Sequence, residues 1–305
     1  MKRLSKCFFH PRRFFRRAAL AQCSLWCYTF GMKTIIEELA LAKLNLTLGI
    51  LYKRQDGYHA IDTIMHTVSL FDRVFIEKSR TVEVTVTGMT LPPDNTMFRA
   101  AELYRQETGC GARIRCEKRI PAEAGLGGGS ADAAAVLRGL QRLHRMCDDQ
   151  TLSRIALAVG ADVPFCLVGG TCRCEGVGEI LTPFAIKDRL HFVLCKPNEG
   201  VSTGALFRAL PLPRPKVDTF GAMAALSRGD LDALAASMQN VLEPPAIERV
   251  PEIGALKQQL SDAGAIAAQM SGSGSAVFGL FRTEAEAKAA VEKIDAPFVQ
   301  YVHSL

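Results

Sequence analysis

The feature that most constrains this chain is a glycine cluster, with four glycines among residues 125–129 and an alanine-rich segment directly after it. Glycine lets the backbone turn tightly and approach a ligand closely. Apolar residues at near-helical spacing predict a helix over residues 133–145, with Ser130 as its N-cap and Asp132 in its first turn. A glycine-rich loop that runs into a helix can direct backbone N–H groups at a phosphate. A flexible loop before a surface helix is the alternative interpretation.

Two common glycine motifs are excluded at this position. A Walker A loop needs Gly-Lys followed by Ser or Thr, and no lysine follows these glycines. The dinucleotide fingerprint is excluded because the residues after Gly125 and Gly127 have the wrong spacing, and no acidic residue is placed to hold a ribose. The loop therefore indicates a phosphate site of another kind.

Length and composition describe a globular protein. A chain of 305 residues can form one large domain or two ordinary ones, and 48% hydrophobic with 22% charged residues is typical of a folded core. No apolar run reaches the ~18 residues of a membrane span. Ten cysteines include no Cys-x-x-Cys pair, so we expect free thiols and no zinc site.

The basic character of the chain is confined to its beginning. Residues 1–31 hold seven Lys or Arg and no acidic residue, whereas the remainder holds 30 basic and 31 acidic residues. We therefore expect no nucleic-acid binding. Residues 1–31 are interpreted as a non-core extension, which is an organelle-targeting arm, a membrane-surface arm or the product of a mis-assigned start with Met32 as the real initiator. The last is favoured, which gives a cytoplasmic enzyme, with import into an organelle only if the arm is real.

The order of predicted elements suggests an α+β protein with two lobes. Residues 44–50 alternate as a half-buried strand after Lys43, and Asp56-Gly57 is a turn. Residues 73–77 and 81–87 are expected to pair as strands, before a helix over 96–107 and a strand over 112–120. The second half has helices predicted over 203–210, 229–242 and 253–263, a Pro-rich connector over 211–215 and a Gly/Ser loop over 269–275. We expect domains at 32–185 and 186–305.

Five sequence blocks in this order resemble the 4-diphosphocytidyl-2-C-methyl-D-erythritol kinases, a family of the GHMP kinase superfamily, from about Glu38 to the C-terminus. The blocks are residues 42–48 with 53–59, the glycine loop, residues 160–165, residues 170–179 and residues 270–278. The Asp-Gly-Tyr-His segment at 56–59 separates this family from its relatives. The resemblance implies a ribosomal protein S5 domain 2-like N-terminal lobe, which binds ATP, and a ferredoxin-like C-terminal lobe.

The resemblance also implies a reaction, the transfer of the γ-phosphoryl group of ATP to the 2-hydroxyl of 4-diphosphocytidyl-2-C-methyl-D-erythritol in the non-mevalonate isoprenoid route. Asp162 would be the general base, and Lys43 would orient it and stabilise phosphate charge. ATP and Mg²⁺ are the implied cofactors, with no protein metal ligand assigned. The residues expected to bind ATP are Pro121, Ala122, Glu123, Ala124, Gly125, Leu126, Gly127, Gly128, Gly129, Ser130 and Ala131, with Asn95 near the adenine.

The substrate side of the site is expected around Asn45, Tyr58, His59 and Phe207. By the resemblance, Tyr58 would stack on cytosine, His59 would bind the edge of the base, and Phe207 would lie on its other side. The loop over 272–274 would close over the phosphates or support the first loop. Ala131 stands where many members have a second serine, so a hydroxyl contact there is lost.

Two rival functions remain open at this point. The chain could be another GHMP small-molecule kinase, of the mevalonate or homoserine type, or a non-catalytic nucleotide-binding regulator of the same fold. A regulator is expected to lack Lys43 or Asp162, and both are present. The expected partner is a small-molecule substrate, and the expected assembly is a monomer or weak homodimer.

Overall fold

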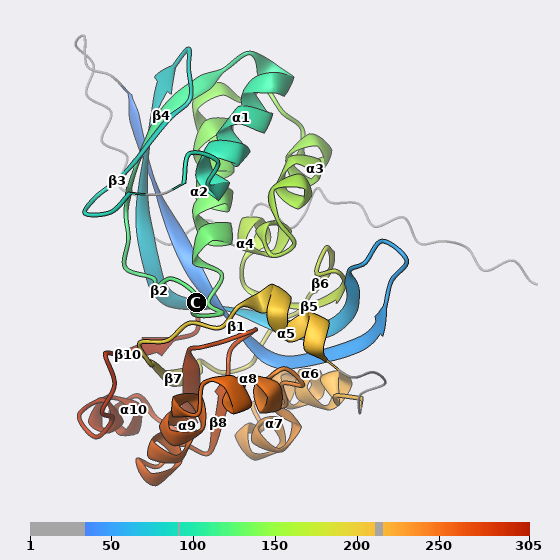
Figure 1. Ribbon diagram of the computed structural model, residues 1–305, viewed down its shortest axis with the longest axis vertical. Helices are drawn as coiled ribbons and strands as arrows, with labels where there is room; N and C mark the ends of the chain where they lie inside the picture. The colour runs from blue at the N-terminus through green and yellow to red at the C-terminus, as the bar shows by residue number, and fades with distance from the viewer. Residues whose placement is uncertain (1–33, 91, 211–215) are drawn as a thin grey trace, which may run out of the picture.

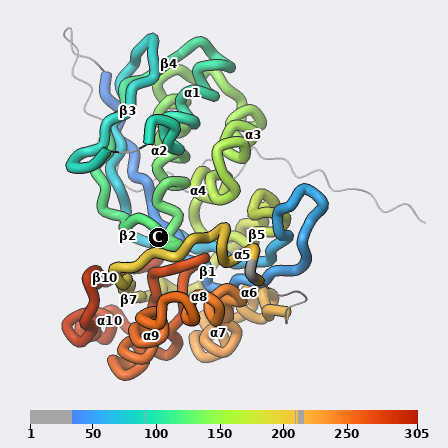
Figure 2. The backbone as a smooth tube through the Cα atoms, viewed as in Figure 1, coloured from blue at the N-terminus to red at the C-terminus, as the bar shows by residue number. Residues whose placement is uncertain are grey.

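The computed structural model describes residues 34–90, 92–210 and 216–305, which form an N-terminal lobe and a C-terminal lobe, each built on one sheet (Figures 1 and 2). The expected extension over 1–31 and the expected connector over 211–215 lie outside the described residues. No helix within the described ranges is long and apolar enough to cross a membrane. The expected domain boundary at residues 185 and 186 stays a prediction.

Two long strands organise the N-terminal lobe. They are β1 (Ile35–Lys53) and β2 (His59–Ser79), an antiparallel hairpin whose turn includes the expected Asp56-Gly57. The other edge of β2 pairs with β4 (Gly111–Glu117) and with β5 (Thr171–Gly176), and the sheet is completed by β3 (Glu83–Val86) and β6 (Ile180–Pro183). The expected pairing of 73–77 with 81–87 is wrong, because β3 pairs with β4 in parallel and residues 73–77 belong to β2.

The expectation of a half-buried strand over 44–50 is also wrong, because side chains on both faces of that stretch are buried. Helix α2 (Gly128–His144) covers one face, and residues of the C-terminal lobe complete the enclosure. Both faces being enclosed explains why polar side chains such as Asn45 and Thr47 need partners inside the protein.

Four helices complete the N-terminal lobe: α1 (Thr96–Thr108), α2, α3 (Asp149–Val159) and the short α4 (Val163–Val168). Helix α2 begins earlier than expected, and Ser130 is not its N-cap. Gly127 caps the helix, with a φ of 70° that favours glycine. The expectation of Asp132 in the first turn is also wrong, because the earlier start of α2 places Asp132 beyond that turn, where it is buried; its partners are described with the site.

The C-terminal lobe has a four-stranded antiparallel sheet in the order β10-β7-β9-β8. The strands are β7 (His191–Lys196), β8 (Ala267–Met270), β9 (Val277–Phe281) and β10 (Phe298–His303). The helices are α5 (Thr203–Ala209), α6 (Thr219–Arg228), α7 (Leu231–Ser237), α8 (Glu243–Arg249), α9 (Glu252–Asp262) and α10 (Glu284–Val291). The helix expected over 229–242 is shorter, since α7 ends at Ser237, while α6 and α8 were not expected.

The two lobes share backbone pairing and a continuous core. Leu48 of β1 forms a parallel bridge with Asn240, and Val68 of β2 forms an antiparallel bridge with Ser304. The core cluster of the N-terminal lobe also includes Phe192 and Phe278 from the C-terminal sheet. The strand that carries Lys43 is therefore held by both lobes.

Candidate active site

The glycine loop lies between β1 and the second Gly/Ser loop, residues 271–276. The Lys43 backbone N–H donates to the Leu126 carbonyl at 3.0 Å. On the other side, the N–H groups of Ser275 and Ala276 donate to the carbonyls of Glu123 and Ala124, each at 3.1 Å. These hydrogen bonds agree with the expectation that the second loop supports the glycine loop.

Two of the glycines have no room for a side chain. Gly125 and Gly127 have φ values of +69° and +70°. A Cβ on Gly125 would lie 1.9 Å from the Ser271 carbonyl oxygen, and one on Gly127 would lie 2.9 Å from Cγ of Lys43. Ser271 also donates its hydroxyl to the Gly125 carbonyl at 3.0 Å. The backbone of the loop is thus packed directly against the stem of Lys43.

The start of α2 offers a site for an anion. The first hydrogen bond of the helix runs from Ala131 N–H to the Gly127 carbonyl at 2.8 Å, so the N–H groups of residues 128–130 precede the helical ladder. Such N–H groups have no partner within the helix and lie at the positive end of its dipole. A phosphate group is a natural ligand for this arrangement.

Lys43 and Asn45 lie on a short paired stretch of β1 with an irregularity on each side. Lys43, Leu44 and Asn45 pair with residues 67 to 65 of β2, and the register shifts both before Lys43 and after Asn45. Such bulges change the direction in which side chains point. Here the result is that the buried Lys43 ammonium lies 2.5 Å from Oδ1 of Asn45.

Asp162 reaches the same ammonium group from α4. Helix α3 stops at Gly160, and Asp162 precedes the first turn of α4 without using its side chain as a cap. Its Oδ2 lies 3.4 Å from Nζ of Lys43, and the side chains are 30% and 5% exposed, respectively. The two residues expected to carry the chemistry therefore meet, with the carboxylate on the solvent side.

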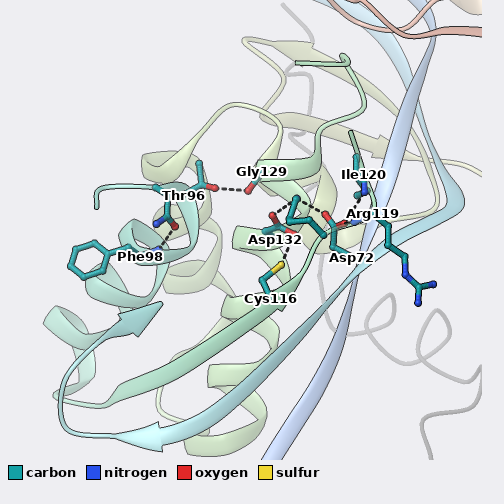
Figure 3. Close-up of polar contacts among 10 residues, drawn as sticks. Asp72, Thr96, Phe98, Cys116, Arg119, Ile120, Gly129 and Asp132 are labelled. Carbon is teal, nitrogen blue, oxygen red and sulfur yellow. Dashed lines mark hydrogen bonds and ion pairs between the residues drawn. The ribbon is translucent and has the colours of Figure 1, made fainter. Parts of the chain in front are cut away.

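A buried charged cluster connects the end of β4 to the start of α2 (Figure 3). Lys118 contacts the carboxylates of both Asp72 and Asp132, the latter at 2.6 Å. Asp72 also accepts from the N–H of Ile120 at 2.8 Å. Burial raises the pKa of the Asp132 carboxyl to about 7, although Lys118 opposes the shift. Burial lowers the pKa of Lys118, but the two carboxylates outweigh it and the pKa is raised overall.

A cavity of about 350 Å³ lies beside the start of α2. It is lined by residues of β3 and its neighbour Val82, of the segment between β3 and α1, and of the first turn of α1: Val82, Val84, Thr85, Val86, Met89, Thr90, Pro92, Pro93, Asn95 and Phe98. Asn95 is the N-cap of α1, accepting from Phe98 N–H at 3.1 Å. Thr96 donates its hydroxyl to the Gly129 carbonyl at 2.7 Å, a contact drawn in Figure 3. The cavity therefore adjoins the glycine loop.

The residues expected to recognise the base lie at the turn of the β1–β2 hairpin and on α5. The His59 and Phe207 rings are 5.1 Å apart and tilted by 39°. Tyr58 is 64% exposed, and no ring contact within the described residues joins it to Phe207. Burial, and secondarily the charge of Lys53, lowers the pKa of His59, so its ring is neutral at pH 7.

Several residues that hold this site in place were not identified from the sequence. Thr63, Gln269 and Asn240 each contact the backbone or side chains near Lys43 or the second loop. Thr63 and Asn240 belong to no motif, Gln269 was noted only as the first residue of the Gly/Ser loop, and their contacts join residues far apart in the chain. Lys118 was also missed, although it stands only three residues before the glycine-loop segment.

Comparison with known proteins defines the class of the chain. Residues 95–170 match the GHMP kinases N terminal domain, and residues 222–300 match the GHMP kinases C terminal domain. The chain is therefore a GHMP kinase, with the two-lobed fold expected from the sequence. A homoserine kinase from Cytophaga hutchinsonii shares this fold, with a TM-score of 0.72 at 23% identity over 92% of this chain and 97% of its own.

Individual relatives define the family more narrowly. The 4-diphosphocytidyl-2-C-methyl-D-erythritol kinase of Caldicellulosiruptor saccharolyticus is 41% identical over 264 residues, or 84% of this chain and 91% of its own. That of Pelotomaculum thermopropionicum is 42% identical over 255 residues, or 81% and 89%. A crystal structure of 4-(cytidine 5'-diphospho)-2C-methyl-D-erythritol kinase matches with a TM-score of 0.76 and 36% identity, covering 88% of this chain and all of that one. The chain belongs to the 4-diphosphocytidyl-2-C-methyl-D-erythritol kinase family, as its sequence blocks predicted.

Proposed function

We propose that this chain phosphorylates the 2-hydroxyl of 4-diphosphocytidyl-2-C-methyl-D-erythritol with ATP, in the non-mevalonate route to isoprenoid precursors. Its family supports the substrate. The observation that carries the chemistry is the contact of Lys43 with Asp162 at 3.4 Å, directly beside the glycine loop. A carboxylate, an ammonium group and a phosphate-binding loop are the groups that phosphoryl transfer to an alcohol requires.

The proposed mechanism assigns one task to each group. The substrate hydroxyl oxygen attacks the γ-phosphorus of ATP, a new O–P bond forms, and the bond to the β-phosphate oxygen breaks to release ADP. Asp162 accepts the hydroxyl proton. Lys43 holds Asp162 in place and stabilises the negative charge on the transferring group, while the N–H groups of residues 128–130 bind the phosphates.

The nucleotide is proposed to extend from the glycine loop into the cavity that Asn95 lines. The volume of about 350 Å³ and a lining of mixed apolar and polar residues suit a purine ring, which has apolar faces and a polar edge. Asn95 already bonds to Phe98 N–H and the Pro92 carbonyl, so we propose that it shapes the cavity rather than binding adenine through its amide.

Mg²⁺ is proposed to arrive with ATP. Within the described ranges, no group of three or more His, Cys, Asp or Glu side chains is arranged to hold a metal ion. Mg²⁺ in kinases keeps waters and binds mainly to substrate phosphates, so a dedicated protein cage is not required. When bound, it would neutralise phosphate charge, and the half-buried Ser130 in the first turn of α2 is proposed to touch it or a phosphate oxygen.

The cytidine end is proposed to bind between the hairpin turn and α5. Tyr58 presents an exposed ring for stacking, and the neutral His59 offers one donor and one acceptor nitrogen to the edge of cytosine. Phe207 supports the His59 ring. Asn45 lies beside Lys43 and is proposed to face the phosphate or polyol portion of the substrate.

The remaining expectations also stand as proposals. We propose a monomer or weak homodimer that acts in the cytoplasm on a small molecule, without nucleic acid. The alternative activities are phosphorylation of mevalonate or homoserine, or nucleotide binding without catalysis.

The deciding experiment is turnover by the purified full-length chain. ADP formation would be followed with Mg²⁺-ATP and 4-diphosphocytidyl-2-C-methyl-D-erythritol, mevalonate or homoserine, with Asp162→Ala as the inactive control. Turnover of the cytidylated alcohol alone, lost in the control, is the expected result. Turnover of mevalonate or homoserine instead would contradict the assignment of Tyr58 and His59, and ATP binding without any turnover would favour the regulator.

A further inference from the structure

Three buried groups form a hydrogen-bonded chain behind Lys43. The Lys43 ammonium donates to Oδ1 of Asn45 at 2.5 Å, and Nδ2 of Asn45 donates to the Thr63 hydroxyl at 2.9 Å. The Thr63 hydroxyl in turn donates to the Thr47 carbonyl. Lys43, Asn45, Thr47 and Thr63 are all buried, so solvent cannot replace any of these partners without a change in structure.

This chain determines which way the Asn45 amide faces. A hydroxyl has one proton, and Thr63 commits that proton to the Thr47 carbonyl. Its oxygen is then available only as an acceptor, so it must face the NH₂ group of Asn45. The amide oxygen consequently faces Lys43. The opposite orientation would point an NH₂ group at an ammonium group, which is repulsive.

The main chain at this point is held separately from the Asn45 side chain. β1 and β2 shift register between Asn45 and Thr47. The Gln269 amide from β8 occupies that irregularity and donates to the carbonyls of Asn45 and Leu46 at 3.1 and 3.3 Å. Gln269 therefore holds the main chain, whereas Thr63 is the residue that contacts the Asn45 side chain on the side away from Lys43.

We propose that Thr63 is a positioning residue for the phosphoryl transfer, which acts through Asn45 to hold the Lys43 ammonium within reach of Asp162. The inference rests on the proposed function but concerns a residue that touches neither substrate nor ATP. Its prediction is specific: the hydroxyl matters for the rate of the chemical step, not for binding of the nucleotide.

The test compares Thr63→Val, which keeps the shape and removes the hydroxyl, with Thr63→Ser, which keeps the hydroxyl. In the full-length chain, Thr63→Val is expected to lower kcat roughly 10- to 100-fold, the range of a lost hydrogen bond in a charged network, with KM for ATP changed less than about twofold. Thr63→Ser is expected to retain kcat within about threefold. Thr219→Val is the matched control, because the buried Thr219 hydroxyl on α6 has no hydrogen-bond partner among the residues that the structure describes.

A double-substitution cycle tests the route of the effect. If Thr63 acts through Asn45, Thr63→Val should add little to Asn45→Ala, so that the double variant is within about threefold of Asn45→Ala alone. Multiplying effects would overturn the proposal. So would a kcat for Thr63→Val equal to that of the unsubstituted chain, or an equal loss in Thr63→Ser.

A readout without turnover separates this proposal from the assignment of the substrate. Competitive labelling with acetic anhydride, followed by peptide mass spectrometry, reports on Lys43 against the exposed Lys288 as an internal reference. Thr63→Val should raise the relative labelling of Lys43 several-fold, and Thr219→Val should not. Unchanged labelling in Thr63→Val would contradict the proposal even if the chain proved to phosphorylate a different alcohol.

Discussion

The two ends of the candidate site are built in opposite ways. Around Lys43, buried hydrogen bonds from β1, β2 and the second Gly/Ser loop fix the glycine loop and the catalytic side chains. At the other end, the hairpin turn carries an exposed Tyr58, and its only described ring contact nearby joins His59 to Phe207. The part of the site around Lys43, here called the assembled end, is thus formed without a ligand. The part around Tyr58, here called the open end, presents surfaces that a ligand can complete.

The largest effect is expected from a substitution in the assembled end. Asp162→Asn should lower kcat by about 10²- to 10⁴-fold, because the proton acceptor is lost. The fold should be little affected, since this side chain is partly exposed and caps no helix. Steady-state kinetics and thermal unfolding of the same preparation measure both effects. Asp149→Asn, an exposed carboxylate on α3, is the control, and a loss of less than tenfold in Asp162→Asn would remove it from the role of general base.

A pair of glycine substitutions compares the two ends directly. Gly125→Ala should destabilise the protein by about 3 kcal/mol or more and abolish ATP binding, because a Cβ there meets the Ser271 carbonyl at 1.9 Å and φ is +69°. Gly57→Ala should cost only about 1 kcal/mol, because its φ is +86° but nothing lies within 4 Å. Denaturant unfolding and calorimetric ATP titration measure the contrast, and equal costs at the two positions would contradict it.

Acid is expected to destabilise the fold near the assembled end through His66, the β2 partner of Leu44. Burial lowers its pKa from 6.5 to about 4. Between these values the unfolded chain binds more protons than the folded one, so stability falls with decreasing pH, by up to about 3 kcal/mol in total. Urea unfolding at pH 7 and pH 4.5 should show this loss in the unsubstituted chain and a smaller one in His66→Gln. Identical pH dependence of the two would refute the role of His66.

The smallest expected effect concerns the open end. Tyr58→Ala should raise KM for the cytidylated substrate about 10- to 100-fold through lost base stacking, with kcat, KM for ATP and thermal stability nearly unchanged. Tyr52→Ala is the matched control, because Tyr52 is 60% exposed on the same hairpin. If both tyrosines gave the same KM, base recognition would have to lie elsewhere.

The sequence predicted the loop and the family because these depend on motifs that are local in the chain, and it was the resemblance to the family that implied the pairing of Lys43 with Asp162. It failed where tertiary structure decides. Ser130 looked like a cap, but the left-handed backbone of Gly127 starts α2 earlier. Residues 44–50 looked half-buried because polar and apolar residues alternate there. The polar members Asn45 and Thr47 are in fact buried too, because they find hydrogen-bond partners inside the protein rather than water.

The residues that support the site were beyond sequence reasoning for the same reason. Asn45 bonds to Thr63 across 18 residues and to Gln269 across 224. A lone threonine or glutamine carries no pattern that distinguishes such a role from an ordinary strand position. Asp132 was similarly expected in the first turn of the helix, and only the fold brings it to Lys118.

The contact between the two Gly-containing loops can form only late in the synthesis of the protein. Gly125 and Ser271 are 146 residues apart in the chain. At about 5–20 residues per second, a ribosome needs roughly 7 to 30 seconds to make the second partner after the first. The phosphate loop therefore emerges long before the segment that fixes it, and nascent chains that stop short of β8 leave the ribosome with an unfinished nucleotide site.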